Sequence, residues 1–331
     1  MISSTVDIRD NFLKELRKHL KSVTVVDLIN KYLGMNARVV DNYVYLDQTQ
    51  YINDMNLYKY DKEYTIPMPS TVNLRREPPN MANSSLLPVT GKLRYLADRT
   101  RPDILVSLGE ISTGGTPHPS DQHIKVSRQM HSYLKSTAKD SIKLGGNLPI
   151  NLFGFSDASH NMAGDSKPRL GGCTYLNNDS GAIHAYSKNA TTFPTVSHSA
   201  CESEIASIDE EIKMIIHIRD ILEFLKQNIS EPTIIYTDSE SGIEILETLK
   251  SSNQLKHINT RINFIRECIN ERIINLAFVP TELNVADTLT KPLPESSFIQ
   301  HKEKLLSGFN GQDLAEYLKQ INNITIITHI D

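Results

Sequence analysis

The sequence predicts an α/β protein: a mixed five-stranded sheet with flanking helices over residues 150–294, preceded by a mostly helical region. After residue 150, β-rich and helical runs follow one another as strand, strand, strand, helix, strand, helix, strand, helix. Before it, apolar residues recur mainly at helical spacing. Between the two regions, Gly145, Gly146 and Pro149 interrupt both patterns, so we expect a domain boundary there.

The composition limits the class of protein. Of the 331 residues, 39% are hydrophobic, which is enough to bury the cores of two domains. The net charge is −4, so a polyanionic partner would have to bind local basic patches. The cysteines show neither a metal-ligand spacing nor a disulfide framework, which fits a reducing compartment; they are Cys173, Cys201 and Cys268. The first 30 residues are rich in charge, and no apolar run approaches 18 residues, so we expect neither secretion nor a membrane partner.

The N-terminal part predicts a helix, a hairpin and a second helix. Apolar residues at steps of four indicate an amphipathic helix over 8–21. Two β-rich runs in 37–47 flank Asp41-Asn42, a composition typical of a hairpin turn. Residues 48–60 then predict a helix with aromatic and apolar residues on one face.

A proline-rich linker over 65–90 precedes two further helices. The first spans about 89–112 and should be kinked or split at Pro102. The second spans about 119–137, with Asp121 as a candidate N-cap. It carries the basic residues His123, Lys125, Arg128, His131 and Lys135. Such a face is most simply solvated surface, and the alternative is a track for phosphates.

The C-terminal part alternates short strands with helices. The longest helix has Ser197 or Ser199 as its candidate cap and Glu202 near its third position, which resembles a capping box. Asn284 should cap a short helix that ends at Leu289. The expected ranges, in chain order, are 152–157, 170–176, 182–186, 198–227, 232–238, 239–250, 257–271, 273–280 and 284–289, with a helical tail from 295 and a short strand or an irregular end at 324–327.

Acidic residues stand at the ends of these elements: Asp157, Asp238, Asp287, and either Glu204 or Glu202. Placed on adjacent strands, they would converge at one edge of the sheet. Carboxylates are hard oxygen ligands that hold Mg²⁺ without His or Cys. Two such ions roughly 4 Å apart can bridge the carboxylates and a scissile phosphate. Each acid alone has a simpler explanation as a turn or cap residue, so the ordered set is the specific signal.

Five segments resemble the C-terminal part of the Pol polyprotein of copia-type (Pseudoviridae-like) retrotransposons, where reverse transcriptase precedes RNase H. They are Ser156–Ser159 (S-D-A-S), Cys201–Ala206 (C-E-S-E-I-A), Thr237–Ile243 (T-D-S-E-S-G-I), Lys256–Glu267 (K-H-I-N-T-R-I-N-F-I-R-E) and Val279–Leu293 (V-P-T-E-L-N-V-A-D-T-L-T-K-P-L). Upstream, four segments resemble the end of the polymerase palm, the thumb and the connection; they are 32–35, 45–52, 91–104 and 123–137.

The resemblance implies an RNase H-like domain that cleaves the RNA strand of RNA–DNA hybrids with two Mg²⁺ or Mn²⁺ ions. The implied catalytic and metal-binding acids are Asp157, Glu204, Asp238 and Asp287. It further implies a cytoplasmic location, in a virus-like particle, or a nuclear one. The implied domains are 1–64 (end of the palm), 65–149 (linker and helical thumb or connection), 150–294 (RNase H-like) and 295–331 (helical tail).

Two members of the catalytic set have open alternatives. In the family, a small residue follows the glutamate by three positions; Ser207 stands there for Glu204, and Ile205 for Glu202. We therefore prefer Glu204 and expect Glu202 close by or as a cap. His257 resembles a family histidine that assists product release, and its alternative is an ordinary solvent-facing loop histidine.

Departures from the family keep other functions open. The Asp-Asp pair of the polymerase occurs nowhere, so we expect no DNA synthesis by this chain alone. Asn259 stands where the family usually has Asp, and the loop after Asp157 is altered. One alternative is an inert nucleic-acid-binding remnant; another is a subunit completed by a palm-containing reverse-transcriptase chain. In the first alternative the phosphate contacts would be Arg94, Arg99, Arg101, Lys125, Arg128 and Lys135.

Overall fold

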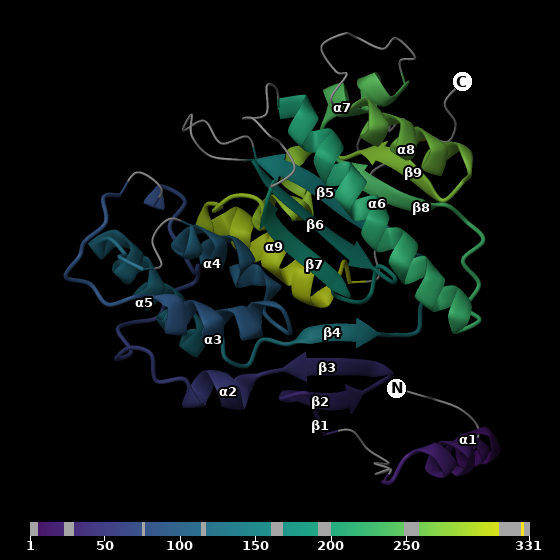
Figure 1. Cartoon of the computed structure of the whole chain (residues 1–331), viewed down its shortest axis with the longest axis horizontal. Helices are drawn as coiled ribbons and strands as arrows, with labels where there is room; N and C mark the ends of the chain where they lie inside the picture. The colour runs from purple at the N-terminus through teal and green to yellow at the C-terminus, as the bar shows by residue number, and fades with distance from the viewer. Residues whose placement is uncertain are drawn as a thin grey trace.

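The computed structural model describes residues 6–22, 30–74, 77–113, 117–159, 168–190, 200–247, 258–310 and 326–327. It contains two sheets with a group of helices beside them (Figure 1). The four-stranded sheet lies along the lower side of the view, and the six-stranded sheet carries α6 (Ala200–Phe224) across one face and α9 (Glu295–Ser307) across the other. Among the described residues, no helix combines the length and apolar character that crossing a membrane requires.

The first sheet has the strand order β1-β2-β3-β4 and confirms the predicted hairpin. Asp41 and Asn42 join its central strands with φ of 49° and 68°, the positive values that a two-residue hairpin turn requires. The fourth strand comes from the segment for which the sequence predicts only a boundary, because pairing with β3 a hundred residues earlier leaves no local periodic signal. The strands are β1 (Lys31–Tyr32), β2 (Met35–Val40), β3 (Tyr43–Asp47) and β4 (Ile142–Gly145).

The helical region confirms the predicted break at Pro102 and corrects two boundaries. The helix predicted over 48–60 ends at Asp54, because Met55 is already extended. Ser120, not Asp121, caps the last helix, where its side chain accepts a hydrogen bond from the backbone N–H of His123. The elements are α1 (Val6–His19), α2 (Thr49–Asp54), α3 (Leu87–Ala97), η2 (Pro102–Ile104), α4 (Leu105–Ser112) and α5 (Asp121–Ser136).

The second sheet confirms the predicted mixed five-stranded architecture. Its strand order is β10-β9-β8-β5-β6-β7, with a two-residue strand added at one edge. The central strand β5 pairs antiparallel with β6 and parallel with β8, which in turn pairs parallel with β9. The strands are β5 (Phe153–Ser159), β6 (Arg169–Tyr175), β7 (His184–Asn189), β8 (Thr233–Thr237), β9 (Ile274–Phe278) and β10 (Ile326–Ile327).

Each face of this sheet packs against its own set of helices. On one face, α6 buries Ile205, Ile208, Ile212 and Ile215 at helical spacing, and α8 packs beside it. The opposite face is aromatic, and Phe153 stacks on Tyr175 with ring centroids 5.0 Å apart. The remaining helical elements are α7 (Glu240–Glu247), α8 (Asn259–Asn270), η4 (Thr281–Leu283) and η5 (Val285–Leu289).

Direct contacts join the helical region and the first sheet to the second sheet. Arg169 of β6 forms an ion pair with Glu110 of α4 at 2.6 Å, and both side chains are largely buried. The backbone N–H of Gly181, in the turn after β6, donates to the carbonyl of Lys143 in β4 at 2.6 Å. One hydrophobic core therefore includes residues from both sides of the predicted boundary.

Candidate metal centre

Three aspartates that are far apart in the sequence meet at the end of the central strands. Asp157 lies in β5, Asp238 directly follows β8, and Asp287 lies in η5. One carboxylate oxygen from each lies within 4.8 Å of the other two. Because β5 and β8 are adjacent and parallel, their C-terminal ends reach the same edge of the sheet. The folded chain thus makes one acidic cluster from three of the predicted positions.

Hydroxyl and amide groups hold two of the three carboxylates in place. Thr290 Oγ1 donates a hydrogen bond to Asp157 Oδ2. Asp238 accepts one from Thr281 Oγ1 at 2.7 Å and another from Asn284 Nδ2 at 3.1 Å. These donors all belong to the segment after β9. They fix the orientation of the two carboxylates but do not neutralise their charge.

Asn284 connects three parts of the site. Its Nδ2 donates to the carbonyl of Ser156 in β5 at 3.1 Å as well as to Asp238. Its Oδ1 accepts from the backbone N–H of Ala286 at 3.2 Å, which confirms the predicted N-cap of the short helix. The cap therefore also sets the position of Asp287 relative to β5 and β8.

Glu204 of α6 lies close enough to Asp157 and Asp238 for their charges to act on it, but it is not one of the three acids whose oxygens lie within 4.8 Å of one another. Burial raises its pKa well above the ordinary value, and the charges of Asp157 and Asp238 raise it further. Its Oε2 is buried and has no hydrogen-bond partner among the described residues. Glu202 is also buried, but residues two apart on a helix project about 200° apart, so the two glutamates cannot both face the aspartates.

Ser207 shows how closely α6 approaches the sheet at this point. Its hydroxyl donates to the carbonyl of Asp157 at 2.7 Å and lies 3.1 Å from that of Gly171. Asp157 and Gly171 are paired across β5 and β6. A larger side chain at position 207 would have to displace the helix, so the small residue three positions after Glu204 keeps that glutamate near the cluster.

The cluster carries more negative charge than its protein partners neutralise. Burial raises the pKa of Asp157; Lys291 opposes this effect, and the charge of Asp238 adds to it. Burial and then the charge of Asp157 raise the pKa of Asp287, and the charge of Lys291 opposes this rise. Because all the donors are carboxylate oxygens and Glu204 Oε2 has no partner, the set fits a hard divalent cation.

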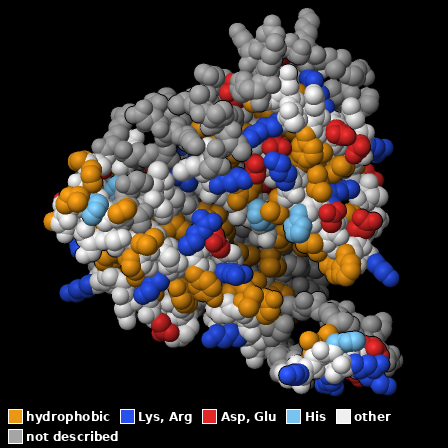
Figure 2. All heavy atoms as spheres, viewed as in Figure 1, with side chains coloured by type: hydrophobic (Ala, Val, Ile, Leu, Met, Phe, Trp, Pro, Cys, Tyr) orange, Lys and Arg blue, Asp and Glu red, His pale blue; other side chains and the backbone are white. Residues whose placement is uncertain are grey.

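Several predicted residues lie elsewhere. Arg101, proposed as a phosphate contact, is fully buried and paired with Asp103 at 2.8 Å, because it faces the core between η2 and α5. His123 and His131 also face the core. Figure 2 shows Lys and Arg interspersed with Asp and Glu on the face in view. His257, Ser197 and Ser199 lie outside the described residues.

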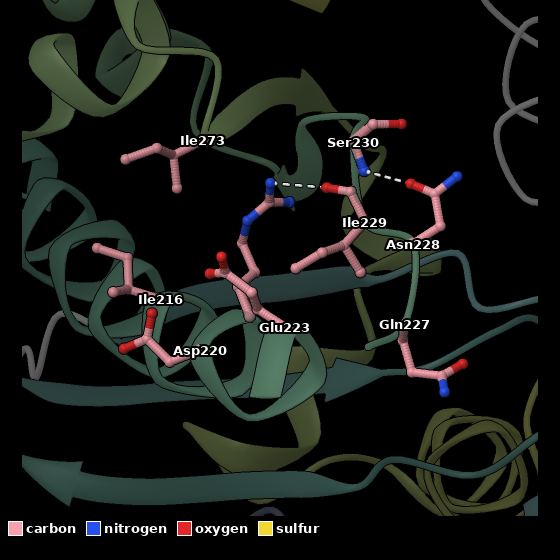
Figure 3. A pocket seen from close by; sticks show the side chains of 9 residues that line it. Ile216, Asp220, Glu223, Gln227, Asn228, Ile229, Ser230 and Ile273 are labelled. Atoms are coloured by element: carbon pink, nitrogen blue, oxygen red, sulfur yellow. Dashed lines mark hydrogen bonds between the residues drawn. The ribbon is translucent and has the colours of Figure 1, made fainter. Parts of the chain in front are cut away.

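A separate hollow of about 420 Å³ lies near the other end of α6 (Figure 3). Arg219 lines it and donates to the carbonyls of Ile229 at 2.9 Å and Glu231 at 3.0 Å. The hollow contains none of the clustered carboxylates. Its lining residues are Ile216, Arg219, Asp220, Glu223, Gln227, Asn228, Ile229, Ser230 and Ile273.

The acids are also contacted directly by three residues that no sequence pattern predicted: Thr281, Thr290 and Lys291. All three lie within Val279–Leu293, the longest of the segments that resemble a known family. The available signal was therefore their position in that segment, since isolated Thr and Lys residues carry no chemical signature of a site.

The chain is similar in sequence to Pol polyproteins of retrotransposons. It is 32% identical over 235 residues to the retrovirus-related Pol polyprotein from transposon TNT 1-94 of Nicotiana tabacum, covering 71% of this chain and 17% of that protein. It is 26% identical over 286 residues to the Pol polyprotein from transposon RE1 of Arabidopsis thaliana, covering 84% of this chain and 19% of that protein. The chain thus spans less than a fifth of these relatives. No protein-family profile matches it.

Among solved structures, the foamy viral protease-reverse transcriptase dRH in complex with double-stranded DNA aligns with 85% of this chain and 44% of its own, at 12% identity and a TM-score of 0.45. LC11-RNase H1 in complex with an RNA/DNA hybrid aligns with 42% of this chain and 93% of its own, at 14% identity and a TM-score of 0.31.

Proposed function

We propose that this chain, whose homologues are the Pol polyproteins of copia-type retrotransposons, is an RNase H-like endonuclease that cleaves the RNA strand of RNA–DNA hybrids. The observation that carries the proposal is the acidic cluster of Asp157, Asp238 and Asp287 with Glu204 beside it. Its partners would be an RNA–DNA hybrid and two Mg²⁺ or Mn²⁺ ions.

In this proposal Asp157, Asp238 and Asp287 would hold the metal ions at the C-terminal ends of β5 and β8. Bound divalent cations supply activation of the attacking water and stabilisation of the leaving oxygen. The protein contributes the arrangement: Thr290 orients Asp157, and Thr281 with Asn284 orients Asp238. Asp238 is only half-buried, so the cluster remains accessible to a phosphate from that side.

The same proposal excludes polymerisation by this chain alone. DNA synthesis needs its own carboxylates to hold the metal ions for nucleotidyl transfer, and the Asp-Asp dipeptide of the polymerase does not occur in the 331 residues.

The test is cleavage of a labelled RNA–DNA hybrid by the purified chain in Mg²⁺ or Mn²⁺. We expect cleavage by the parent chain and none by Asp157→Asn. Asp209→Asn is a matched control, because Asp209 is also a buried aspartate of this domain but lies outside the cluster. Equal cleavage by Asp157→Asn would contradict the proposal. Salt-dependent binding of the hybrid without cleavage would favour the inert binding remnant instead.

A further inference from the structure

Lys291 reaches back from the end of η5 to the acidic cluster. Its Nζ lies 2.8 Å from Asp287 Oδ1, four residues earlier. The lysine side chain is 43% exposed, whereas that of Asp287 is 7% exposed. The preceding residue, Thr290, donates to Asp157. Two consecutive residues thus contact two of the three aspartates, one with a neutral hydroxyl and one with a charge.

Within the part of the chain that the structure describes, no other Lys or Arg forms an ion pair with Asp157, Asp238 or Asp287. One ammonium therefore faces a cluster of carboxylates, which it cannot neutralise. Its charge also acts on Asp157 and Glu204, whose pKa values it lowers against the effect of burial. The Lys291 ammonium neutralises part of the negative charge of the carboxylates, and a divalent ion would neutralise more of it.

We propose that Lys291 is a displaceable counter-ion of this centre: its ammonium occupies Asp287 in the metal-free chain and leaves that carboxylate when a divalent cation binds. The inference rests on the proposed metal-dependent function. Asp287 Oδ1 already contacts the ammonium, so a metal ion bound by the same oxygen would be placed beside a like charge. The exposed, flexible lysine stem allows the ammonium to move into solvent.

Lys291 then has two opposite effects. It stabilises the metal-free fold by partly neutralising the acids, and it weakens metal binding because its displacement opposes the binding. Removing the charge without shortening the side chain should separate these effects. We expect Lys291→Met to reach half of its maximal metal-induced rise in Tm at about tenfold lower Mn²⁺ than the parent chain.

The experiment is a thermal melt of the full chain in EDTA and across a Mn²⁺ titration, without nucleic acid. Lys291→Met should melt below the parent in EDTA and show the larger rise with Mn²⁺. Lys291→Arg keeps the charge and should retain the parent half-point. Lys213→Met is the matched control, since Lys213 pairs with Asp209 at the same spacing and the same 2.8 Å but lies outside the cluster. Its half-point should equal that of the parent.

Each other result is decisive. If Lys291→Met lowers Tm equally with and without Mn²⁺, the lysine is merely structural and the inference is wrong. A higher Mn²⁺ half-point for this variant would also overturn it. If the parent responds to Mn²⁺ and Lys291→Met responds identically, the counter-ion role fails while the metal centre stands. If the parent shows no response, the metal centre and the counter-ion fail together.

Discussion

The hydroxyl of Ser207 on α6 donates a hydrogen bond of 2.7 Å to the backbone carbonyl of Asp157 on β5. This contact joins the helix that carries Glu204 to the strand that carries the central aspartate. The same hydroxyl also contacts the carbonyl of Gly171, which is paired with Asp157 in the sheet. Ser207 is fully buried, so a larger side chain at this position would not fit between α6 and the sheet.

The first prediction tests this contact with two substitutions. Ser207→Ala removes only the hydroxyl and should lower the free energy of unfolding by about 1–2 kcal/mol while retaining hybrid cleavage. Ser207→Leu must push α6 away from the sheet, so cleavage should be lost and the free energy of unfolding should fall further. Denaturant unfolding and the cleavage assay measure the two effects. Full cleavage by Ser207→Leu would contradict the close approach as a requirement of the site.

The second prediction concerns the metal response. Millimolar Mn²⁺ should raise the Tm of the parent chain, because an ion that binds only the folded state stabilises it. The double variant Asp157→Asn, Asp238→Asn should lose this rise. In EDTA the double variant should melt at or above the parent temperature, since two like charges have been removed.

The control for the metal response is Asp209→Asn, which should melt lower because its ion pair with Lys213 is lost but should keep the rise with Mn²⁺. If the parent and the double variant shift equally with Mn²⁺, the three aspartates are not the metal site. Loss of the rise in Asp209→Asn would indicate a general effect of destabilisation.

The third prediction distinguishes the two glutamates. Glu204→Gln should abolish cleavage and weaken the Mn²⁺ response, because the charge of this glutamate interacts with Asp157 and Asp238. Glu202→Gln should retain most of both. The two variants make the same chemical change on the same helix, two residues apart. Cleavage by Glu204→Gln at the parent rate, with loss in Glu202→Gln, would reverse the assignment.

The fourth prediction is a pH dependence of stability from Glu211. This carboxyl is fully buried between α6 and the sheet, and burial raises its pKa to about 8 from 4.5. The carboxyl occupies the space that Gly154 and Gly172 leave open, and Thr174 Oγ1 donates to it at 2.6 Å. The folded state thus holds the proton more tightly than the unfolded state.

A raised carboxyl pKa gives a stabilising contribution that is fully present below pH 4.5 and is lost as the pH rises toward 8. Between pH 5 and pH 8, the free energy of unfolding of the parent should therefore fall by at least about 2 kcal/mol more than that of Glu211→Gln. Urea unfolding at several pH values measures the difference.

The neighbouring Glu210 provides the control for this pH dependence of the free energy of unfolding. It is paired with Lys188 and Lys213, and its hydrogen bond and charge interaction with Lys188 hold its pKa below the ordinary value against burial. Glu210→Gln should lower the free energy of unfolding by about the same amount at every pH above 5. Its free energy of unfolding should therefore fall with rising pH as steeply as that of the parent. Equal slopes for the parent and Glu211→Gln would mean that Glu211 is ionised in the folded state.

Local sequence patterns determined the type and order of most elements. Two β-rich runs and the turn composition between them predicted the hairpin at Asp41-Asn42, and a long helical run predicted α6. The N-cap Asn284 and the break at Pro102 are also local features. These predictions succeeded because backbone preferences and side-chain periodicity act over a few residues.

Only the tertiary structure decided which side chains meet. Strand β4 depends on pairing with β3, about a hundred residues away, and Arg101 is buried because Asp103 and Thr137 surround its guanidinium. The sequence alone could name the acids through a family resemblance, but it could not show that Lys291 pairs with Asp287 within the cluster. Such contacts depend on the faces that distant elements present to one another after the core has packed, and local periodicity does not encode them.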